Sequence, residues 1–201
     1  MKPAELPVDQ LRDWLARGTR GDEAACAALY HHFCPPVERL ALGLLGDRED
    51  AEEVTQDAFV YALKNLGRYD ERRSAFSTWL YTITLSRCRN KRRRKWLSLA
   101  PLDLLASEGP RHGDRLVETM LERRGVRAQL WQAVQALPPR LREAVVLRYL
   151  AEMRYKEIGE TVGCNPKTAE SRVRQGLQAL RAALQAAGMP AEGELVEQWG
   201  W

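Results

Sequence analysis

Helical periodicity runs through almost the whole of this 201-residue sequence, and the strand-like alternation of apolar and polar residues is absent. Apolar residues recur at helical spacing over 22–44, 48–66, 74–96 and 127–187. The stretch 97–125 interrupts the pattern, because it contains prolines and glycines and keeps no sustained period. The sequence therefore predicts an all-α protein with two small helical domains joined by a flexible linker.

The domain boundaries follow from these breaks in periodicity. We expect an N-terminal extension (1–21), a first helical domain (22–96), a linker (97–125), a second helical domain (126–187) and an acidic tail (188–201). Within the first domain, the pair Pro35–Pro36 is expected to kink or break a helix that starts at Asp22. Asp47 is expected to cap the helix that follows.

Basic residues are concentrated in two parts of the chain, although the net charge is only +4. Residues 1–70 carry a net charge of −5, whereas residues 71–96 carry +8. Residues 126–187 form the second basic zone, with 10 basic and 5 acidic side chains. Two basic zones indicate two contacts with a polyanion, and the acidic segments leave a separate surface for another partner.

The segment 155–184 is typical of a helix, a tight turn and a longer helix. Gly163 is expected to end the first helix, and Asn165 is expected to cap the second. The second helix carries one polar face: Lys167, Ser171, Arg174 and Gln178. Such a face suits the DNA major groove, because Lys and Arg attract phosphate whereas Ser, Arg and Gln can hydrogen-bond to base edges. A solvated face on a helical hairpin is the alternative interpretation.

The helix expected over 74–96 ends in a basic run, since seven of the nine residues from 87 to 95 are basic. Such a run alone is typical of a solvated helix end. One edge of the same helix adds an aromatic ring, hydroxyls, a cation and an amide: Trp79, Thr82, Ser86, Arg89 and Asn90. These groups can stack on unpaired bases and hydrogen-bond to them. Trp79 closing the core is the alternative interpretation.

The helix expected over 48–66 turns a largely acidic face outward. This face comprises Glu49, Glu53, Gln56, Asp57 and Val60. Its charge suits a basic protein partner, although a solvated surface explains the pattern equally simply.

Composition excludes several classes of protein. No apolar run approaches the about 20 residues that a membrane helix needs, and the N-terminus lacks the apolar region of a secretory signal. Four scattered cysteines without a CxxC pair indicate a reduced, cytoplasmic compartment.

A metal-responsive module is an alternative, based on the nearby set Cys26, His31, His32 and Cys34, but buried thiols are the usual explanation. No nucleophile–His–acid set is evident, so neither an enzyme nor a cofactor is expected.

Five stretches taken together resemble an extracytoplasmic-function (ECF) sigma factor of bacterial RNA polymerase, group IV of the sigma-70 family. They are GDEAACAALYHHF, LLGDREDAEEVTQDAFVYALKNL, SAFSTWLYTITLSRCRNKRRR, LPPRLREAVVLRYL and YKEIGETVGCNPKTAESRVRQGLQALR. The resemblance covers 22–96 as a sigma-2 domain and 127–184 as a sigma-4 domain with a helix-turn-helix. It implies a protein that binds core polymerase and directs promoter-specific initiation by melting the −10 element and recognising the −35 element.

The resemblance also implies roles for individual residues. Those expected to hold the −10 strand are Trp79, Thr82, Ser86, Arg89, Asn90, Lys91, Arg92 and Arg93. Those expected in the −10 specificity turn are Tyr69, Asp70, Arg72, Arg73 and Ser74. Those expected on the −35 duplex are Pro166, Lys167, Thr168, Glu170, Ser171, Arg172, Arg174 and Gln175. Those expected on core polymerase are Asp50, Glu53, Gln56, Asp57 and Val60.

The implied partners are promoter DNA, the clamp helices of the β′ subunit, the flap of the β subunit and an anti-sigma factor. The implied location is the cytoplasm, with nucleoid association when bound to polymerase. The sequence departs from the family pattern at Ser86, where Asn is frequent, at Glu170, where a basic residue is frequent, and at Arg154, where a capping Ser is common. The alternative function is a two-domain helix-turn-helix regulator that acts without core polymerase.

Overall fold

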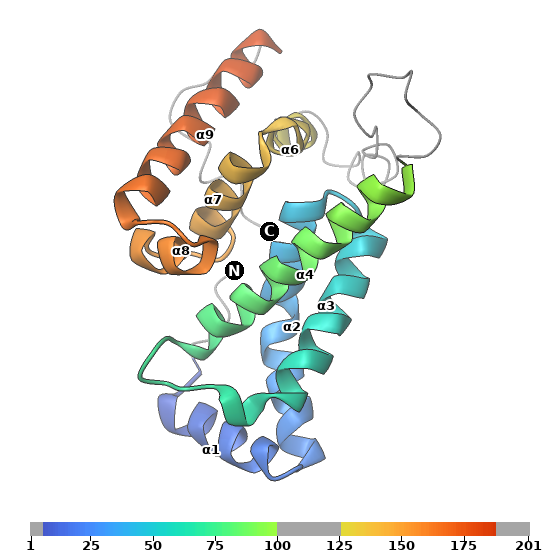
Figure 1. Ribbon diagram of the computed structural model, residues 1–201, viewed down its shortest axis with the longest axis vertical. Coiled ribbons are helices and arrows are strands. Elements are labelled where there is room, and N and C mark those ends of the chain that lie inside the picture. Colours follow the sequence, from blue (N-terminus) through green and yellow to red (C-terminus); the bar gives the residue numbers. More distant parts are fainter. Residues whose placement is uncertain (1–5, 100–125, 188–201) are drawn as a thin grey trace.

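The computed structural model describes residues 6–99 and 126–187, so the predicted tail and most of the predicted linker lie outside the described residues. Within these ranges the chain is helical and holds no β-strand, which confirms the all-α prediction. The elements are α1 (Val8–Thr19), α2 (Glu23–Leu45), α3 (Arg48–Lys64), η1 (Leu66–Arg68), α4 (Phe76–Leu99), α6 (Val126–Ala136), α7 (Pro139–Tyr149), α8 (Tyr155–Val162) and α9 (Pro166–Ala186). They form an N-terminal bundle (α1–α4) and a C-terminal bundle (α6–α9), as Figure 1 shows.

In the N-terminal bundle, α2, α3 and α4 pack together and α1 packs against α2 at one end (Figure 1). Asp47 caps α3 as predicted, because its carboxylate accepts the backbone N–H of Asp50 at 2.9 Å. The core contains the buried side chains Leu29, Phe33, Leu40, Val54, Phe59, Phe76 and Leu80. Full burial of such a side chain contributes about 1.5–3 kcal/mol, so this core is the main source of the bundle's stability.

Of the kink or break expected at Pro35–Pro36, a break is wrong, because α2 continues from Glu23 to Leu45 through both prolines. Each proline lacks the N–H that would bond to the carbonyl four residues earlier. Packing offsets this loss, since Pro36 and Val37 are buried in the core. Tertiary burial therefore outweighs the local preference of the two prolines.

The C-terminal bundle contains the predicted helix-turn-helix. Gly163 ends α8 with a φ of 76°, a left-handed conformation that glycine adopts readily. Asn165 caps α9 by accepting the Thr168 N–H at 2.7 Å. At Gly159, a Cβ atom would lie only 2.6 Å from the Cys164 carbonyl oxygen. The predicted turn is confirmed. The absence of a side chain at Gly159 lets the backbone of the turn pack directly on α8.

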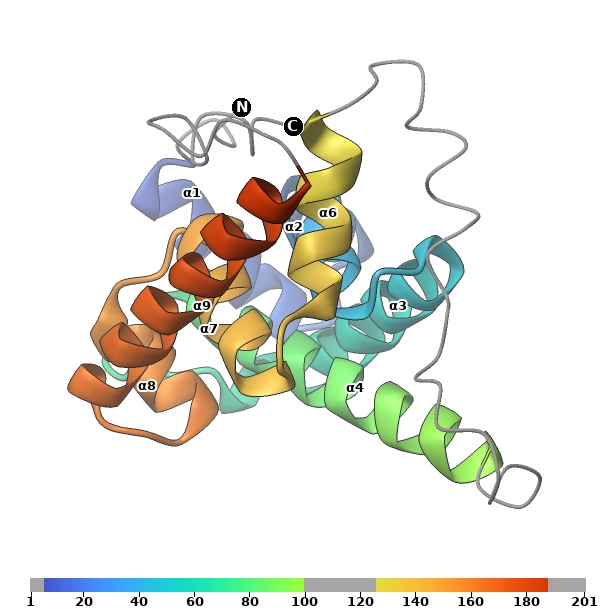
Figure 2. The same cartoon turned by 90° about the horizontal axis from the view of Figure 1, so that it is seen from above.

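The two bundles pack against each other, with α7 on α2 and α8 on α4 (Figures 1 and 2). Gly43 lets α2 approach α7 closely. A Cβ atom at this position would lie 2.6 Å from Leu150 Cδ1 and 3.0 Å from Val146 Cγ1. The absence of a side chain at Gly43 therefore shapes the contact between the bundles.

Arg142 and Gln135 anchor the C-terminal bundle to the end of α2. Arg142 Nη1 donates to the Leu44 carbonyl at 3.3 Å, and Gln135 Nε2 donates to the Gly43 carbonyl at 2.9 Å. The last carbonyls of a helix carry partial negative charge, so they suit a guanidinium. Burial, together with the positive charge of Arg92, lowers the pKa of Arg142 to about 10.

Candidate nucleic-acid and polymerase interfaces

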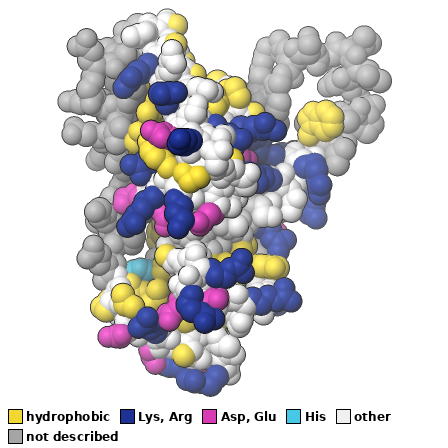
Figure 3. Space-filling view, turned by 60° about the vertical axis from the view of Figure 1, so that its left-hand side comes forward, with side chains coloured by type: hydrophobic (Ala, Val, Ile, Leu, Met, Phe, Trp, Pro, Cys, Tyr) yellow, Lys and Arg dark blue, Asp and Glu magenta, His cyan; other side chains and the backbone are white. Residues whose placement is uncertain are grey.

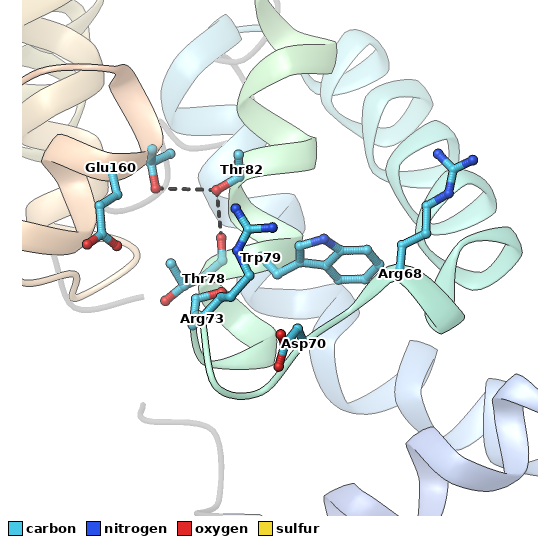
Figure 4. A pocket seen from close by; sticks show the side chains of 9 residues that line it. Arg68, Asp70, Arg73, Thr78, Trp79, Thr82 and Glu160 are labelled. Atoms are coloured by element: carbon cyan, nitrogen blue, oxygen red, sulfur yellow. Dashed lines mark hydrogen bonds between the residues drawn. The ribbon is translucent and has the colours of Figure 1, made fainter.

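A cavity of about 570 Å³ lies between the turn before α4, the first turns of α4 and the end of α8 (Figure 4). Both bundles line it, with Arg68, Asp70, Arg73, Ser74, Thr78, Trp79, Thr82, Glu160 and Thr161. The structure therefore brings the predicted specificity turn together with Trp79 and Thr82 around one space. These two are the first of the α4 residues predicted to hold the −10 strand, which we call the −10 strip. The volume of the cavity falls within the range of about 300–1,000 Å³ that is typical of small-molecule sites.

The turn 69–74 is held by its own hydrogen bonds. The Tyr69 hydroxyl donates to the Ser74 carbonyl at 3.0 Å. Asp70 accepts from the Arg72 guanidinium at 3.1 Å and from the Arg72 backbone N–H at 3.0 Å, and both contacts lower the pKa of Asp70. Burial raises the pKa of Tyr69, which keeps its hydroxyl protonated as a donor. The turn thus has a defined shape before any ligand binds.

Trp79 both packs on the core and lines the cavity. Its ring centroid lies 5.6 Å from that of Tyr69 and 5.6 Å from that of Phe76. The side chain is half-buried, and Figure 4 shows it beside the turn. The two interpretations of Trp79 are therefore compatible, because it contributes to the core and borders the open space.

The edge of α4 that carries Thr82, Ser86 and Arg89 faces the C-terminal bundle. Thr82 Oγ1 lies 3.3 Å from Thr161 Oγ1 (Figure 4). Arg89 donates two hydrogen bonds to the Glu143 carboxylate of α7, at 2.9 and 2.7 Å. These hydrogen bonds raise the pKa of Arg89. Part of the predicted −10 strip is therefore in contact with α7 and α8.

Glu157 joins the start of α8 to α4. One of its carboxylate oxygens accepts the Arg154 backbone N–H at 2.7 Å, and the other accepts the Thr78 hydroxyl at 3.3 Å. Arg154 has no side-chain acceptor with which to cap α8. Instead, the Glu157 carboxylate accepts the backbone N–H of Arg154 and so satisfies this group at the start of α8.

Part of the basic run on α4 turns toward α3. Lys91 forms ion pairs with Glu53 and with Asp50, the second at 3.4 Å, and Lys95 pairs with Asp50. The other predicted −10 residues in this run are exposed or half-buried: Asn90, Arg92 and Arg93. Lys91, predicted to hold DNA, is thus engaged within the N-terminal bundle.

The residues predicted to contact polymerase do not form one uniform face of α3. Asp50 has a side chain that is 12% exposed and lies between two lysines. The others are exposed: Glu53, Gln56, Asp57 and Val60. Tyr61, which the sequence analysis missed, is exposed beside Val60, and the Arg87 guanidinium lies 5.0 Å over its ring. The exposed surface is therefore acidic, with an apolar part toward the C-terminal end of α3.

Helix α9 presents the predicted −35 residues on its outer side. Its inner stripe is buried: Ala169, Val173, Leu180 and Leu184. The exposed members of the predicted set are Pro166, Lys167, Glu170, Arg174 and Gln175, and the half-buried ones are Thr168, Ser171 and Arg172. Gln175 Nε2 donates to Ser171 Oγ at 3.2 Å. Figure 3 shows a face of the molecule on which Lys and Arg side chains extend over both bundles.

Several residues of these sites were not predicted. Arg68 and Thr78 line the cavity beside the predicted turn, and Arg68 could have been found as a cation directly before it. Glu143 lies 54 residues from Arg89, and Glu157 lies 79 residues from Thr78. No local sequence pattern indicates contacts over such separations.

The described residues contain no helix long and apolar enough to span a bilayer. Within 6–99 and 126–187, no three or more His, Cys, Asp or Glu side chains lie together in a way that could hold a metal ion. His32 packs edge-on against Trp14 and Phe33, with ring centroids 6.3 and 4.8 Å apart, respectively. The geometry therefore gives no support to the alternative metal-responsive module.

Comparison with known proteins identifies the family. Residues 29–97 match Sigma-70 region 2, and residues 127–180 match Sigma-70 region 4. The chain is 32% identical to the ECF RNA polymerase sigma factor SigE of Mycolicibacterium smegmatis, over 87% of this chain and 68% of that protein. It is 29% identical to SigW of Bacillus subtilis, over 82% of this chain and 91% of that protein. The chain belongs to the ECF sigma factors, regulatory proteins that bind core RNA polymerase and direct promoter-specific initiation.

Solved structures share the fold. The sigma factor RpoE in complex with the anti-sigma factor NepR from Bartonella quintana has a TM-score of 0.62 at 19% identity, over 79% of this chain and 96% of that one. CnrH in complex with the cytosolic domain of CnrY has a TM-score of 0.64 at 22% identity, over 88% of this chain and 98% of that one. The matches to the two sigma-70 regions and to curated ECF sigma factors, described above, do not favour the alternative of a regulator that acts without polymerase.

Proposed function

We propose that this sigma factor holds a promoter at two places, one strand-separated and one double-stranded. The observation that carries this proposal is the cavity beside Trp79, which the turn 69–74 borders. An unpaired −10 base enters this space, stacks on Trp79 and is read by the hydroxyl, carboxylate and guanidinium groups around it. Arg89, Asn90, Arg92 and Arg93 hold the adjoining phosphates, while Lys91 keeps the basic part of α4 attached to α3.

Capture of the base offsets part of the cost of melting. Unstacking a base from duplex DNA requires a few kcal/mol, and stacking on an aromatic side chain returns about 1–3 kcal/mol. Ser86 has a shorter side chain than the Asn frequent in the family, so the residues of the turn carry more of the base discrimination.

The C-terminal bundle reads the −35 element as duplex. The N-terminal turn of α9 enters the major groove, where Lys167 and Arg172 contact phosphates and Ser171, Arg174 and Gln175 reach base edges. Glu170 accepts from a cytosine amino group instead of contacting phosphate. Each DNA contact alone has a modest affinity. Because polymerase holds the two bundles at a fixed spacing, the second contact forms within a complex that is already bound, which raises the overall affinity for the promoter.

The exposed face of α3 docks on the clamp helices of the β′ subunit, and the C-terminal bundle docks on the flap of the β subunit. Glu53, Gln56, Asp57 and Val60 supply the first contact, whereas the partly buried Asp50 shapes it through its lysine partners. The protein makes and breaks no covalent bond, acts in the cytoplasm and joins the nucleoid with polymerase. An anti-sigma factor regulates it, as the complexes of the structural relatives suggest.

The experiment is run-off transcription with purified core polymerase on a promoter library, followed by mapping of transcript starts. Initiation at defined positions that requires this protein supports the proposal. DNA binding by the protein without polymerase-dependent initiation would contradict it and would favour a regulator that acts alone.

A further inference from the structure

Helix α1 lies directly beside the turn that we propose to read the −10 element. It precedes residues 29–97, which match Sigma-70 region 2, and it packs against η1, the element before the turn. The packing is close, because a Cβ atom at Gly18 would lie 3.0 Å from Leu66 Cδ1. Gly18 and Leu66 are both buried. Helix α1 is therefore fixed against the segment from which the turn starts.

Arg12 of α1 reaches the turn and holds Glu71. Its Nε donates to Glu71 Oε2 at 2.9 Å, and its Nη2 donates to Glu71 Oε1 at 3.5 Å. Two guanidinium nitrogens on two carboxylate oxygens form the forked arrangement by which arginine fixes the orientation of an acid as well as its place. Both side chains are more than half exposed, so the pair contributes little to the free energy of folding. Its consequence lies in the charge of the turn.

The turn itself carries two acids and two arginines, whose charges cancel: Asp70, Glu71, Arg72 and Arg73. Asp70 is paired with Arg72, which leaves Glu71 and Arg73. Arg73 is exposed and lines the cavity beside Trp79. A DNA strand needs such a cation for its phosphates, whereas an unpaired carboxylate two residues away would attract the same guanidinium.

Arg12 changes this balance, because it supplies a cation from outside the turn. Each acid of the turn then has its own arginine, Asp70 through Arg72 and Glu71 through Arg12. Within the described residues, no acid forms an ion pair with Arg73. The guanidinium of Arg73 is therefore available at the cavity.

We propose that Arg12 is a positioning residue for −10 recognition, which holds the Glu71 carboxylate against α1 and so leaves Arg73 free to bind promoter DNA. This inference rests on the proposed role of the turn 69–74. Arg12 acts through Glu71 and does not itself touch DNA. Helix α1, which precedes Sigma-70 region 2, thereby belongs to the −10 site.

The test is a double-mutant cycle in the holoenzyme, with the full-length protein bound to core polymerase. The probe is a fluorescent fragment of a promoter found by transcript-start mapping, in which the −10 bases are mismatched and therefore unpaired. Arg12→Ala should weaken binding of this fragment roughly two- to fivefold, the range of an exposed ion pair, because Glu71 then pairs with Arg73. Glu71→Gln should keep the wild-type affinity, and Arg12→Ala added to it should cause no further loss.

An equal loss from Arg12→Ala with and without Glu71→Gln would overturn the proposal. Such a result would mean that Arg12 contacts a phosphate directly or acts through its net charge alone, since neither effect requires Glu71. Measurement at about 0.15 M ionic strength limits the second effect, because screening there acts over about 8 Å.

Arg73→Ala provides a second cycle that does not depend on the Glu71 variant. It removes the guanidinium that Arg12 is proposed to keep free, so it should weaken binding of the fragment by itself. Adding Arg12→Ala should then cause no further loss. A full additional loss in the double variant would overturn the proposal.

Arg20→Ala is the matched control. Arg20 is exposed at the C-terminal end of α1, about 12 Å along the helix axis from Arg12, so the variant makes the same change in net charge away from Glu71. It should bind the fragment with the wild-type affinity. A loss equal to that of Arg12→Ala would show a general charge effect and would overturn the proposal. Urea denaturation and anisotropy with core polymerase should show that Arg12→Ala retains its folding stability and its polymerase affinity.

Transcript-start mapping separates this inference from the proposed function. The wild type and Arg12→Ala should start transcripts at the same positions, with fewer transcripts from the variant. If the wild type does not initiate, the proposed function fails and this inference fails with it. If the wild type initiates and neither cycle shows coupling, only the role of Arg12 is refuted.

Discussion

The Tyr69 hydroxyl donates a hydrogen bond to the Ser74 carbonyl at 3.0 Å, so the first residue of the turn 69–74 is bonded directly to the last. This contact fixes one wall of the cavity beside Trp79 without involving a charged group. It links the core, in which the Tyr69 ring packs 5.3 Å from that of Phe76, to the surface proposed to read the −10 element.

Tyr69→Phe removes this hydrogen bond and keeps the ring. A neutral hydrogen bond contributes about 0.5–1.5 kcal/mol, so the population of open promoter complexes should fall roughly two- to 13-fold. Permanganate reactivity of unpaired thymines measures opening, and fluorescence anisotropy measures core-polymerase affinity, which should stay the same. Wild-type opening by the variant would show that the hydrogen bond does not support promoter opening.

Trp79→Ala should impair promoter opening more than polymerase binding. Loss of one stacking surface removes about 1–3 kcal/mol, which corresponds to roughly five- to 150-fold in opening. Phe76→Leu is the control, because Phe76 packs against Trp79 in the core but does not line the cavity. The control should lower thermal stability and retain opening below its melting temperature; equal loss of opening in both variants would indicate a purely structural Trp79.

Arg174→Ala should relax discrimination at one −35 position by about 1–3 kcal/mol if the guanidinium reads a base. Binding to duplexes with single substitutions measures this, at several salt concentrations. Arg181→Ala is the matched control, since Arg181 is also exposed on α9 but lies further along the helix. A uniform loss of affinity across all sequences for Arg174→Ala would assign the residue to a phosphate.

Asp50 and Asp57 should behave differently, although both were predicted to contact polymerase. Asp50→Asn weakens the ion pairs with Lys91 and Lys95 and should lower the free energy of unfolding by about 1–3 kcal/mol. Asp57→Lys changes an exposed residue and should weaken polymerase association without affecting stability. Urea denaturation and anisotropy with core polymerase separate the two effects. Unchanged polymerase affinity for Asp57→Lys would remove this face of α3 from the interface.

Tyr81 should make the fold sensitive to alkali. Burial raises its pKa from 10.0 in the unfolded chain to about 12. The stabilising contribution of the neutral phenol is therefore complete below pH 10 and is lost as the pH rises through about 12, by about 2–3 kcal/mol in total. The lowered pKa of Arg142 acts in the opposite direction over the same range, so the comparison must be with Tyr81→Phe.

The difference in unfolding free energy between wild type and Tyr81→Phe isolates the phenol. The wild type should lose stability relative to the variant between pH 10 and pH 12, and tyrosinate absorbance should reveal a late-titrating phenol that the variant lacks. A pH-independent difference between the two proteins would contradict the burial-induced shift.

Local chemistry explains which parts of the fold were predictable. Asp47, Gly163 and Asn165 specify helix ends through backbone groups within a few residues, so their roles could be inferred and are confirmed. The break at Pro35–Pro36 was a wrong prediction for the opposite reason. The burial that offsets the missing backbone bonds comes from other helices.

The candidate site was predictable only in part. The aromatic, hydroxyl and cationic edge of α4 could be inferred from helical spacing, but its contacts with the C-terminal bundle could not. Arg89 meets Glu143 only after the whole chain has folded, and Asp50 is removed from the exposed face by lysines more than 40 residues away. Ion pairs between residues far apart in the chain produce no periodic pattern in the sequence, so they could not be predicted from it.

The most direct measurement of the central claim is transcript-start mapping with purified core RNA polymerase, a genomic promoter library and this protein, alone and as Trp79→Ala or Arg174→Ala. The account predicts defined start sites that depend on the wild-type protein, weakened opening with the first variant and altered −35 preference with the second. Absence of polymerase-dependent start sites with the wild-type protein would contradict it.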